Sequence, residues 1–219
     1  MEKISNHPAA ELLAAYSAGS LPLSQALCVA AHLEHCGKCL HDLQQLNRVG
    51  SELMQQLDPS PPSMRLKQNL LERLDSLQDS VAEPTFGGNP SIPRCLRKFV
   101  SSDYRDLRWK RVSPGIQSVE LCRDSNGARV ELMRIKPGGS AMTHSHLGDE
   151  YTVILEGSFS DEQGLYRKGD FLVKGDDDRH TPVATLDGEC ICLAVTEGPI
   201  QLSGILGCLL NPLIRRSYA

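Results

Sequence analysis

The fold of the N-terminal part of this chain is decided by one short segment, residues 32–39, which reads His-Leu-Glu-His-Cys-Gly-Lys-Cys. The spacing His32-x3-Cys36-x2-Cys39 puts the three side chains at about 0°, 40° and −20° around a single helix, given 3.6 residues per turn. Gly37 permits a break between two helices, and the three side chains would still converge at that corner. Two thiolates and an imidazole suit Zn²⁺, whose structural sites are closed by a fourth ligand. The segment therefore predicts a zinc site that fastens helices together.

The sequence offers four candidates for the fourth ligand, which are His7, His35, His41 and Cys28. His41 would lie about 180° from His32 on a continuous helix, so it points away. His7 stands before Pro8 at the entrance of the first expected helix, where a neighbouring helix end could deliver it, and we choose it. A zinc finger would need a second ligand pair downstream, and a thioredoxin-like redox motif would need a βαβ context; the sequence has neither. The predicted zinc ligands are His7, His32, Cys36 and Cys39.

Around this segment, residues 8–78 have the apolar spacing of helices. Leu12, Leu13 and Tyr16 mark a short first helix, and Pro22 can stand near the start of a second. A third helix has apolar residues at spacings of three and four between positions 40 and 57, and the proline-rich positions 58–62 must end it. A fourth helix at 63–78 is richer in leucine than a solvated helix should be. It either packs on its own bundle or, as we favour, forms a surface for a partner.

The second half of the chain has a different period. Proline and glycine predict a linker at 81–95. Beyond it, residues 117–123 and 128–135 alternate polar and apolar, and 151–155, 171–173 and 190–195 predict further short strands between glycine-rich turns. Such strands indicate an antiparallel sandwich or barrel, while the tail from 199 to 219 could be a strand or a helix. We predict an α + β chain with a helical domain at 1–80 and a β domain at 96–219, only weakly coupled through the flexible linker.

A second group of potential metal ligands lies in the β domain. His144 and His146 are two residues apart on an expected strand, so both side chains leave the same face. A turn at 147–149 lets Glu150 swing back toward them. His180 is the only histidine further downstream and is the expected fourth ligand. Three imidazoles and a carboxylate suit Zn²⁺, Mn²⁺, Fe²⁺ or Ni²⁺, and the sequence does not choose among these ions.

Residues 137–150 and 169–180 resemble the two cupin motifs. The second segment departs from the pattern, because it lacks the usual Pro-x-Gly and the terminal Asn. The resemblance implies an antiparallel β-barrel of the cupin type, a jelly roll. Two alternatives stay open: a vestigial barrel without metal, and an enzymatic cupin in which Glu150 is a catalytic base.

Composition narrows the classes of function. A net charge of −4 and a pI near 6.0 disfavour direct nucleic-acid binding. No apolar run approaches the ~18–20 residues that a membrane span needs, and the start lacks a signal-peptide pattern, so we expect a cytoplasmic protein without membrane contact. In a reducing compartment, eight cysteines are metal ligands, buried thiols or redox sensors rather than structural disulfides. Cys190 and Cys192 share one face of a strand, as small buried residues or as redox sensors near the metal.

Residues 7–78 resemble the zinc-binding anti-sigma domain, and the order of the two domains resembles ChrR-type anti-sigma factors. The resemblance implies that the helical domain binds an extracytoplasmic-function sigma factor and covers its RNA-polymerase-binding surfaces. It also implies that the cupin domain is needed for release when singlet oxygen or a related oxidant appears. The protein would then be a regulator and not an enzyme. The competing hypotheses are a cupin dioxygenase or isomerase with an accessory zinc module, and a sensor whose barrel binds a small metabolite. Stoichiometric co-purification with a sigma factor would separate them.

Overall fold

The computed structural model describes residues 4–76, 89–203, 207, 210–212, 214 and 216. The expected four helices are all present, as α1 (Ala10–Ser17), α2 (Leu23–Leu33), α3 (Gly37–Gln55) and α4 (Met64–Ser76). The proline-rich segment at 58–62 separates α3 from α4, because proline cannot donate the backbone hydrogen bonds of a helix interior. The expected end of the fourth helix and most of the expected linker, residues 77–88, lie outside the described residues.

The described part of the second half contains eleven strands and two short 3₁₀ helices. The 3₁₀ helices are η1 (Arg94–Leu96) and η2 (Tyr104–Asp106). The strands are β1 (Lys110–Ser113), β2 (Ile116–Arg123), β3 (Arg129–Ile135), β4 (His144–His146), β5 (Glu150–Glu156), β6 (Ser158–Asp161), β7 (Gly164–Arg167), β8 (Phe171–Lys174), β9 (Val183–Ala184), β10 (Cys190–Thr196) and β11 (Ile200–Leu202). The alternating and apolar stretches named from the sequence are thus strands. Shorter strands such as β6, β7 and β9 were not singled out, because two to four residues carry too little periodicity.

The strands form a six-stranded sheet in the order β1-β2-β3-β10-β5-β8, a three-stranded sheet β7-β6-β9 and a two-stranded sheet β11-β4. All pairings are antiparallel, as expected for a barrel of the cupin type. The ambiguous tail begins as a strand, since β11 pairs with β4 and so lies beside the two histidines of that strand. Described positions beyond it, such as 210–212, are helical.

Strand β10 lies in the middle of the large sheet and is buried along its whole length. Its odd-numbered residues, including Leu193, belong to a core shared with the helices, whereas Cys190 and Cys192 belong to a second core with Phe159 and Ile154. Side chains alternate across a strand, so one sheet can serve two apolar layers. The large sheet therefore has helices on one face and the smaller sheets on the other.

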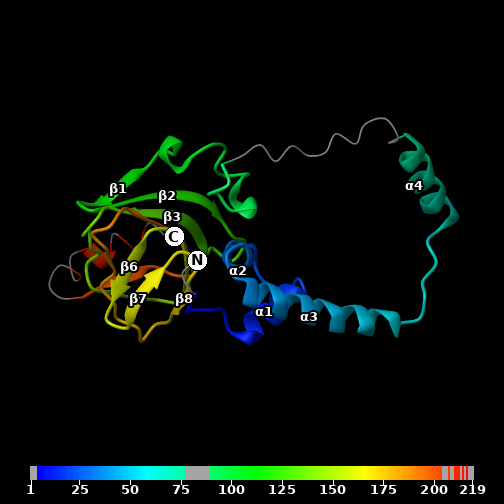
Figure 1. The fold of residues 1–219 in the computed structure, drawn as a ribbon, viewed down its shortest axis with the longest axis horizontal. Helices are drawn as coiled ribbons and strands as arrows, with labels where there is room; N and C mark the ends of the chain where they lie inside the picture. The colour runs from blue at the N-terminus through cyan, green and yellow to red at the C-terminus, as the bar shows by residue number, and fades with distance from the viewer. Residues whose placement is uncertain are drawn as a thin grey trace.

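The helical unit, which comprises α1 to α4, is joined to the barrel by direct packing and not only by a flexible linker. Helix α2 packs directly on β5 and β10, and Cys28, Val29 and Ala31 on this helix are completely buried. Ile92, near the end of the expected linker, is also buried in the shared core. Figure 1 shows α2 lying against the barrel, whereas α3 projects away from it and α4 stands apart. The expectation of weak coupling between the two halves is therefore wrong, because α2 is part of the barrel's own core.

Candidate metal centres

The first centre is formed where the helical unit meets the barrel. His7, His32, Cys36 and Cys39 each offer one ligand atom, and these atoms all lie within 4.8 Å of one another. His7 Nδ1 is 3.4 Å from the sulfur of each cysteine. Helix α2 ends at Leu33 and α3 begins at Gly37, so the break expected at this glycine is present. The sequence-based set is thus brought together by α2, the start of α3 and the segment ahead of α1; its role as a set of metal ligands stays a prediction.

The imidazole of His32 has one nitrogen that is hydrogen-bonded and one that is available to a metal ion. Its Nδ1 donates a hydrogen bond to the backbone carbonyl of Gly169, at 2.7 Å. A carbonyl can only accept, so Nε2 carries the lone pair, and it is buried without a hydrogen-bond partner in the described part of the chain. Burial lowers the pKa of His32 to about 4, which keeps the ring neutral. A buried nitrogen lone pair beside two sulfurs fits a thiophilic cation such as Zn²⁺.

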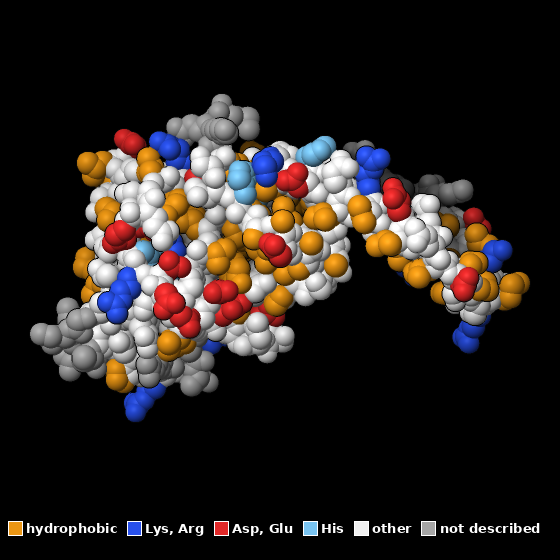
Figure 2. All heavy atoms as spheres, turned by 90° about the horizontal axis from the view of Figure 1, so that it is seen from below, with side chains coloured by type: hydrophobic (Ala, Val, Ile, Leu, Met, Phe, Trp, Pro, Cys, Tyr) orange, Lys and Arg blue, Asp and Glu red, His pale blue; other side chains and the backbone are white. Residues whose placement is uncertain are grey.

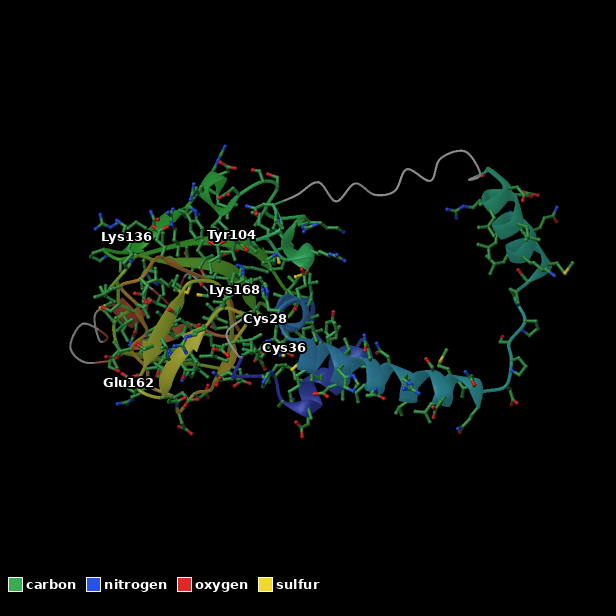
Figure 3. All side chains as sticks on the ribbon, in the orientation of Figure 1. Cys28, Cys36, Tyr104, Lys136, Glu162 and Lys168 are labelled. Carbon is green, nitrogen blue, oxygen red and sulfur yellow. The ribbon has the colours of Figure 1, made fainter. Side chains whose placement is uncertain are left out.

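Cys36 and Cys39 stand at the start of α3. The sulfur of Cys36 accepts the backbone N–H of Cys39 at 3.4 Å, as in a helix cap. Burial raises the pKa of the Cys39 thiol to about 12, so without a cation it holds its proton. A bound cation would reverse that preference, because coordinated thiols lose their proton. Figure 3 shows Cys36 and Cys28 where the helices meet the barrel.

The second centre lies inside the barrel. His144 and His146 stand on β4, Glu150 begins β5, and His180 pairs with His144 through an isolated β-bridge. The Nε2 atom of His180 is 3.1 Å from the Nε2 atoms of both other histidines. The carboxylate of Glu150 is 2.9 Å from His146 Nε2. All four side chains are buried, so the predicted set converges at one point.

The protonation of the second centre also fits a cation. His144 Nδ1 donates to the carbonyl of Met142 at 2.8 Å, which leaves the Nε2 lone pair facing the other ligands. Burial lowers the pKa of His180 to about 4. Burial alone would raise the pKa of Glu150, but the hydrogen bond with His146 and the nearby imidazoles hold it at about 2. Three imidazoles around an ionised carboxylate form a set that a divalent ion would complete.

Two buried charged residues behind His180 escaped the sequence analysis. The Lys174 ammonium is 2.9 Å from the carboxylate of Asp161, whose other oxygen accepts from the Tyr166 hydroxyl at 2.9 Å. The same carboxylate is 3.6 Å from His180 Nδ1. Lys174 shares the inward face of β8 with Leu172, so the two-residue period was the only available signal. A lysine at a strand end is normally exposed, so the sequence alone gave no reason to expect Lys174 to be buried.

A cavity of about 270 Å³ opens beside the second centre. His144 and Glu150 form part of its wall, and the remainder is mainly apolar, with Met133, Ile200 and Leu202 among the lining residues. Cys190 and Cys192 lie in the apolar core on the inner face of β10, and burial raises the pKa of both thiols. Both cysteines are therefore protonated and buried in this state.

Comparison with known proteins decides the family. A family model described as the ChrR cupin-like domain matches residues 98–201. Over 213 residues, 97% of this chain and 99% of the relative, the sequence is 32% identical to the anti-sigma-E factor ChrR of Cereibacter sphaeroides. The chain belongs to the ChrR family of anti-sigma factors. Members of this family are regulators, so the expectation that the protein is not an enzyme is confirmed, as is the resemblance found in the sequence.

A solved structure agrees with this membership. The crystal structure of Rhodobacter sphaeroides SigE in complex with the anti-sigma ChrR contains a chain that is 31% identical. The match covers 89% of this chain and all of the other, with a TM-score of 0.77. The helical unit and the cupin-type barrel are therefore arranged much as in that relative. No helix in the described ranges combines the length and the apolar character that crossing a bilayer requires.

Proposed function

We propose that this ChrR family member binds an extracytoplasmic-function sigma factor through its helical unit and keeps that factor from RNA polymerase. The observation that supports this proposal is a row of exposed apolar side chains on and between α3 and α4. This α3–α4 apolar surface consists of Val49, Leu53, Met54, Leu57, Met64, Leu66, Leu70, Leu71 and Leu74. Each of these side chains is between 48% and 82% exposed. Apolar exposure of this extent marks a surface for a partner. Figure 2 shows apolar side chains continuing along the part of the molecule that projects from the barrel, which is formed by α3 and α4.

The partner is a sigma factor because the matched crystal structure is a complex of SigE with ChrR. Helix α4 has no buried residue, and a helix of its length is only marginally stable alone in water. Its apolar side therefore has to be covered by another protein for the helix to be stable. A sigma factor held between α4 and the rest of the helical unit would cover both parts of the surface.

The metals of the two centres are proposed separately. Zn²⁺ is proposed for His7, His32, Cys36 and Cys39, because two thiolates and two imidazoles are a common structural zinc set. For His144, His146, Glu150 and His180 we propose Zn²⁺ or another divalent ion such as Mn²⁺, Fe²⁺ or Ni²⁺. The first ion would fasten the helices, and its binding free energy would add to folding.

The barrel is proposed to control release of the sigma factor under oxidative stress such as singlet oxygen. The cavity beside His144 and Glu150 would let a small oxidant or metabolite reach the second metal. Release requires a signal that favours one of two states of the protein. Since α2 packs on β5 and β10, a change in the barrel can be passed to the helices. We also propose that the protein acts in the cytoplasm, where sigma factors meet RNA polymerase.

A promoter reporter for the sigma factor tests the proposal, with Leu70→Lys as the variant. Burial of a leucine contributes about 1.5–3 kcal/mol, so a charge there should weaken the complex at least about tenfold and switch the reporter on. Leu165→Lys is the matched control, because Leu165 is 41% exposed against 48% for Leu70 but lies on β7. His144→Ala should keep the reporter off and make it unresponsive to singlet oxygen. Equal repression by the Leu70 and Leu165 variants would contradict the proposed surface, and an inducible His144 variant would contradict the role of the barrel.

A further inference from the structure

The turn between β7 and β8 touches the first metal centre, although it belongs to the barrel. Its residue Gly169 supplies the carbonyl that accepts from His32 Nδ1. Phe171, the first residue of β8, packs edge-on against the same imidazole, with 5.8 Å between the ring centroids. The orientation of this ligand is therefore set from the barrel side, with Nε2 aimed at the sulfurs.

The same turn also holds the chain just ahead of His7. One carboxylate oxygen of Asp170 accepts the backbone N–H of Ser5 at 2.8 Å and that of Asn6 at 2.9 Å. The backbone N–H of Phe171 donates to the carbonyl of Asn6 at 3.0 Å. Three hydrogen bonds thus anchor the residues that precede His7. A ligand next to such an anchor has little freedom to leave the centre.

Close approach of the two units depends on the missing side chain of Gly169. The residue has φ of +92°, and a Cβ here would lie 2.6 Å from Ile4 Cδ1 and 3.0 Å from His35 Cβ. The end of the Ile4 side chain can turn aside, but the Cβ of His35 is fixed to its backbone, so a larger residue would force the turn and the helical unit apart by a few tenths of an ångström. Gly127 has nearly the same φ, +88°, but open space around its Cα.

We propose that the barrel turn Gly169–Phe171 positions His7 and His32, two of the four ligands of the first metal centre, so that metal retention there depends on the docked barrel. The proposal rests on the proposed use of this centre as a metal site. Hydrogen-bond partners of ligating histidines typically contribute 10- to 100-fold to metal affinity, and here the partner comes from the other structural unit.

This arrangement gives the barrel a physical route to the sigma-binding helices. Strand β8 begins at Phe171 against His32 and ends at Lys174, which pairs with Asp161 behind His180. The contact of Phe171 with the first centre and the ion pair of Lys174 behind the second centre are thus at opposite ends of one four-residue strand. A shift of β8 that followed a change at the second centre would withdraw the carbonyl of Gly169 from His32 and loosen the first centre.

The test uses the full-length protein loaded with Co²⁺, because only the centre with cysteines shows a thiolate-to-cobalt charge-transfer band. Loss of this band on addition of a chelator is followed for wild type, Gly169→Ala and Gly127→Ala. We expect Gly169→Ala to lose cobalt about 10- to 100-fold faster than wild type, from the typical contribution of such hydrogen bonds. Gly127→Ala carries the same backbone strain without the collision and should behave as wild type. Asp170→Asn, which alters one acceptor oxygen without adding bulk, should move the rate in the same direction and by less.

The results distinguish a wrong assignment of the metal site from a wrong assignment of the role of the barrel turn. If the wild type shows no charge-transfer band, the proposed metal site itself is wrong. If the band forms and Gly169→Ala releases cobalt at the wild-type rate, or if Gly127→Ala matches Gly169→Ala, the barrel turn does not position the ligands. Unfolding of Gly169→Ala would show in circular dichroism, and Asp170→Asn then decides, with unchanged release overturning the proposal.

Discussion

Replacement of Lys174 by methionine removes the positive charge from a buried ion pair and preserves most of the side-chain volume. Lys174 is 4% exposed, and its ammonium lies 2.9 Å from Asp161 and 2.7 Å from the amide oxygen of Gln163. The side chain of Asp161 is completely buried. The variant therefore leaves a buried carboxylate without its counter-charge, next to His180.

Breaking a buried pair by removing one partner typically costs about 3–5 kcal/mol. Asp161 keeps hydrogen bonds from the Tyr166 hydroxyl and the backbone N–H of Gln163, so we expect the low end, about 3 kcal/mol. For a chain of this size, that is a fall in Tm of roughly 6–12 °C. The double variant Asp161→Asn with Lys174→Met should recover part of the loss, because no buried charge remains.

The loss should also depend on pH. Burial alone would raise the pKa of Asp161, but the Lys174 ammonium and the hydrogen bonds hold it below its usual value. A carboxyl with a lowered folded-state pKa stabilises the protein above its unfolded pKa of about 3.9, and that stability is lost as pH falls through the folded-state pKa. Lys174→Met should therefore be most destabilised near neutral pH and approach the wild type in acid.

Differential scanning calorimetry at matched metal content measures these changes. Lys110→Met is the control, since Lys110 is an exposed lysine on β1. A Lys174→Met protein that melts within about 2 °C of wild type at neutral pH would refute the reasoning, because that corresponds to less than about 1 kcal/mol. A double variant less stable than the sum of the single changes would equally show that the pair is not what stabilises this region.

Two further predictions concern the second centre and the start of α2. Elemental analysis of wild type should find metal at both ligand sets, and His180→Ala should lose only the barrel ion; a wild type with one ion or none would contradict the two-centre assignment. Asp124 accepts the backbone N–H and hydroxyl of Ser24 at 2.9 and 2.8 Å, contacts that lower its pKa. Its stabilising effect should be present above the unfolded pKa and disappear in acid. Asp124→Asn should speed hydrogen exchange at the start of α2 at neutral pH but not in acid, whereas Asp58→Asn should leave it unchanged.

Much of this protein is determined by features that are local in the sequence. The four helices follow from apolar residues three and four apart and from the proline-rich break at 58–62, and the long strands follow from alternation. Spacing also identified His32, Cys36 and Cys39 as a set, because separations of four and three bring side chains together at a helix turn. The same holds for His144 and His146, whose separation of two puts them on one face of β4.

Only the tertiary structure decides how distant segments meet. His7 was chosen from its position alone, and it meets the two cysteines where the chain ahead of α1 is hydrogen-bonded to Asp170. The bond from His32 to Gly169 joins residues 137 positions apart, and no local period records such a pairing. The burial of Lys174 and the docking of α2 on the barrel also result from contacts between segments that are far apart in the sequence. Periodicity tells which face of an element is apolar, whereas the packing of whole elements chooses what covers that face, and here it joins the helical unit and the barrel through one core.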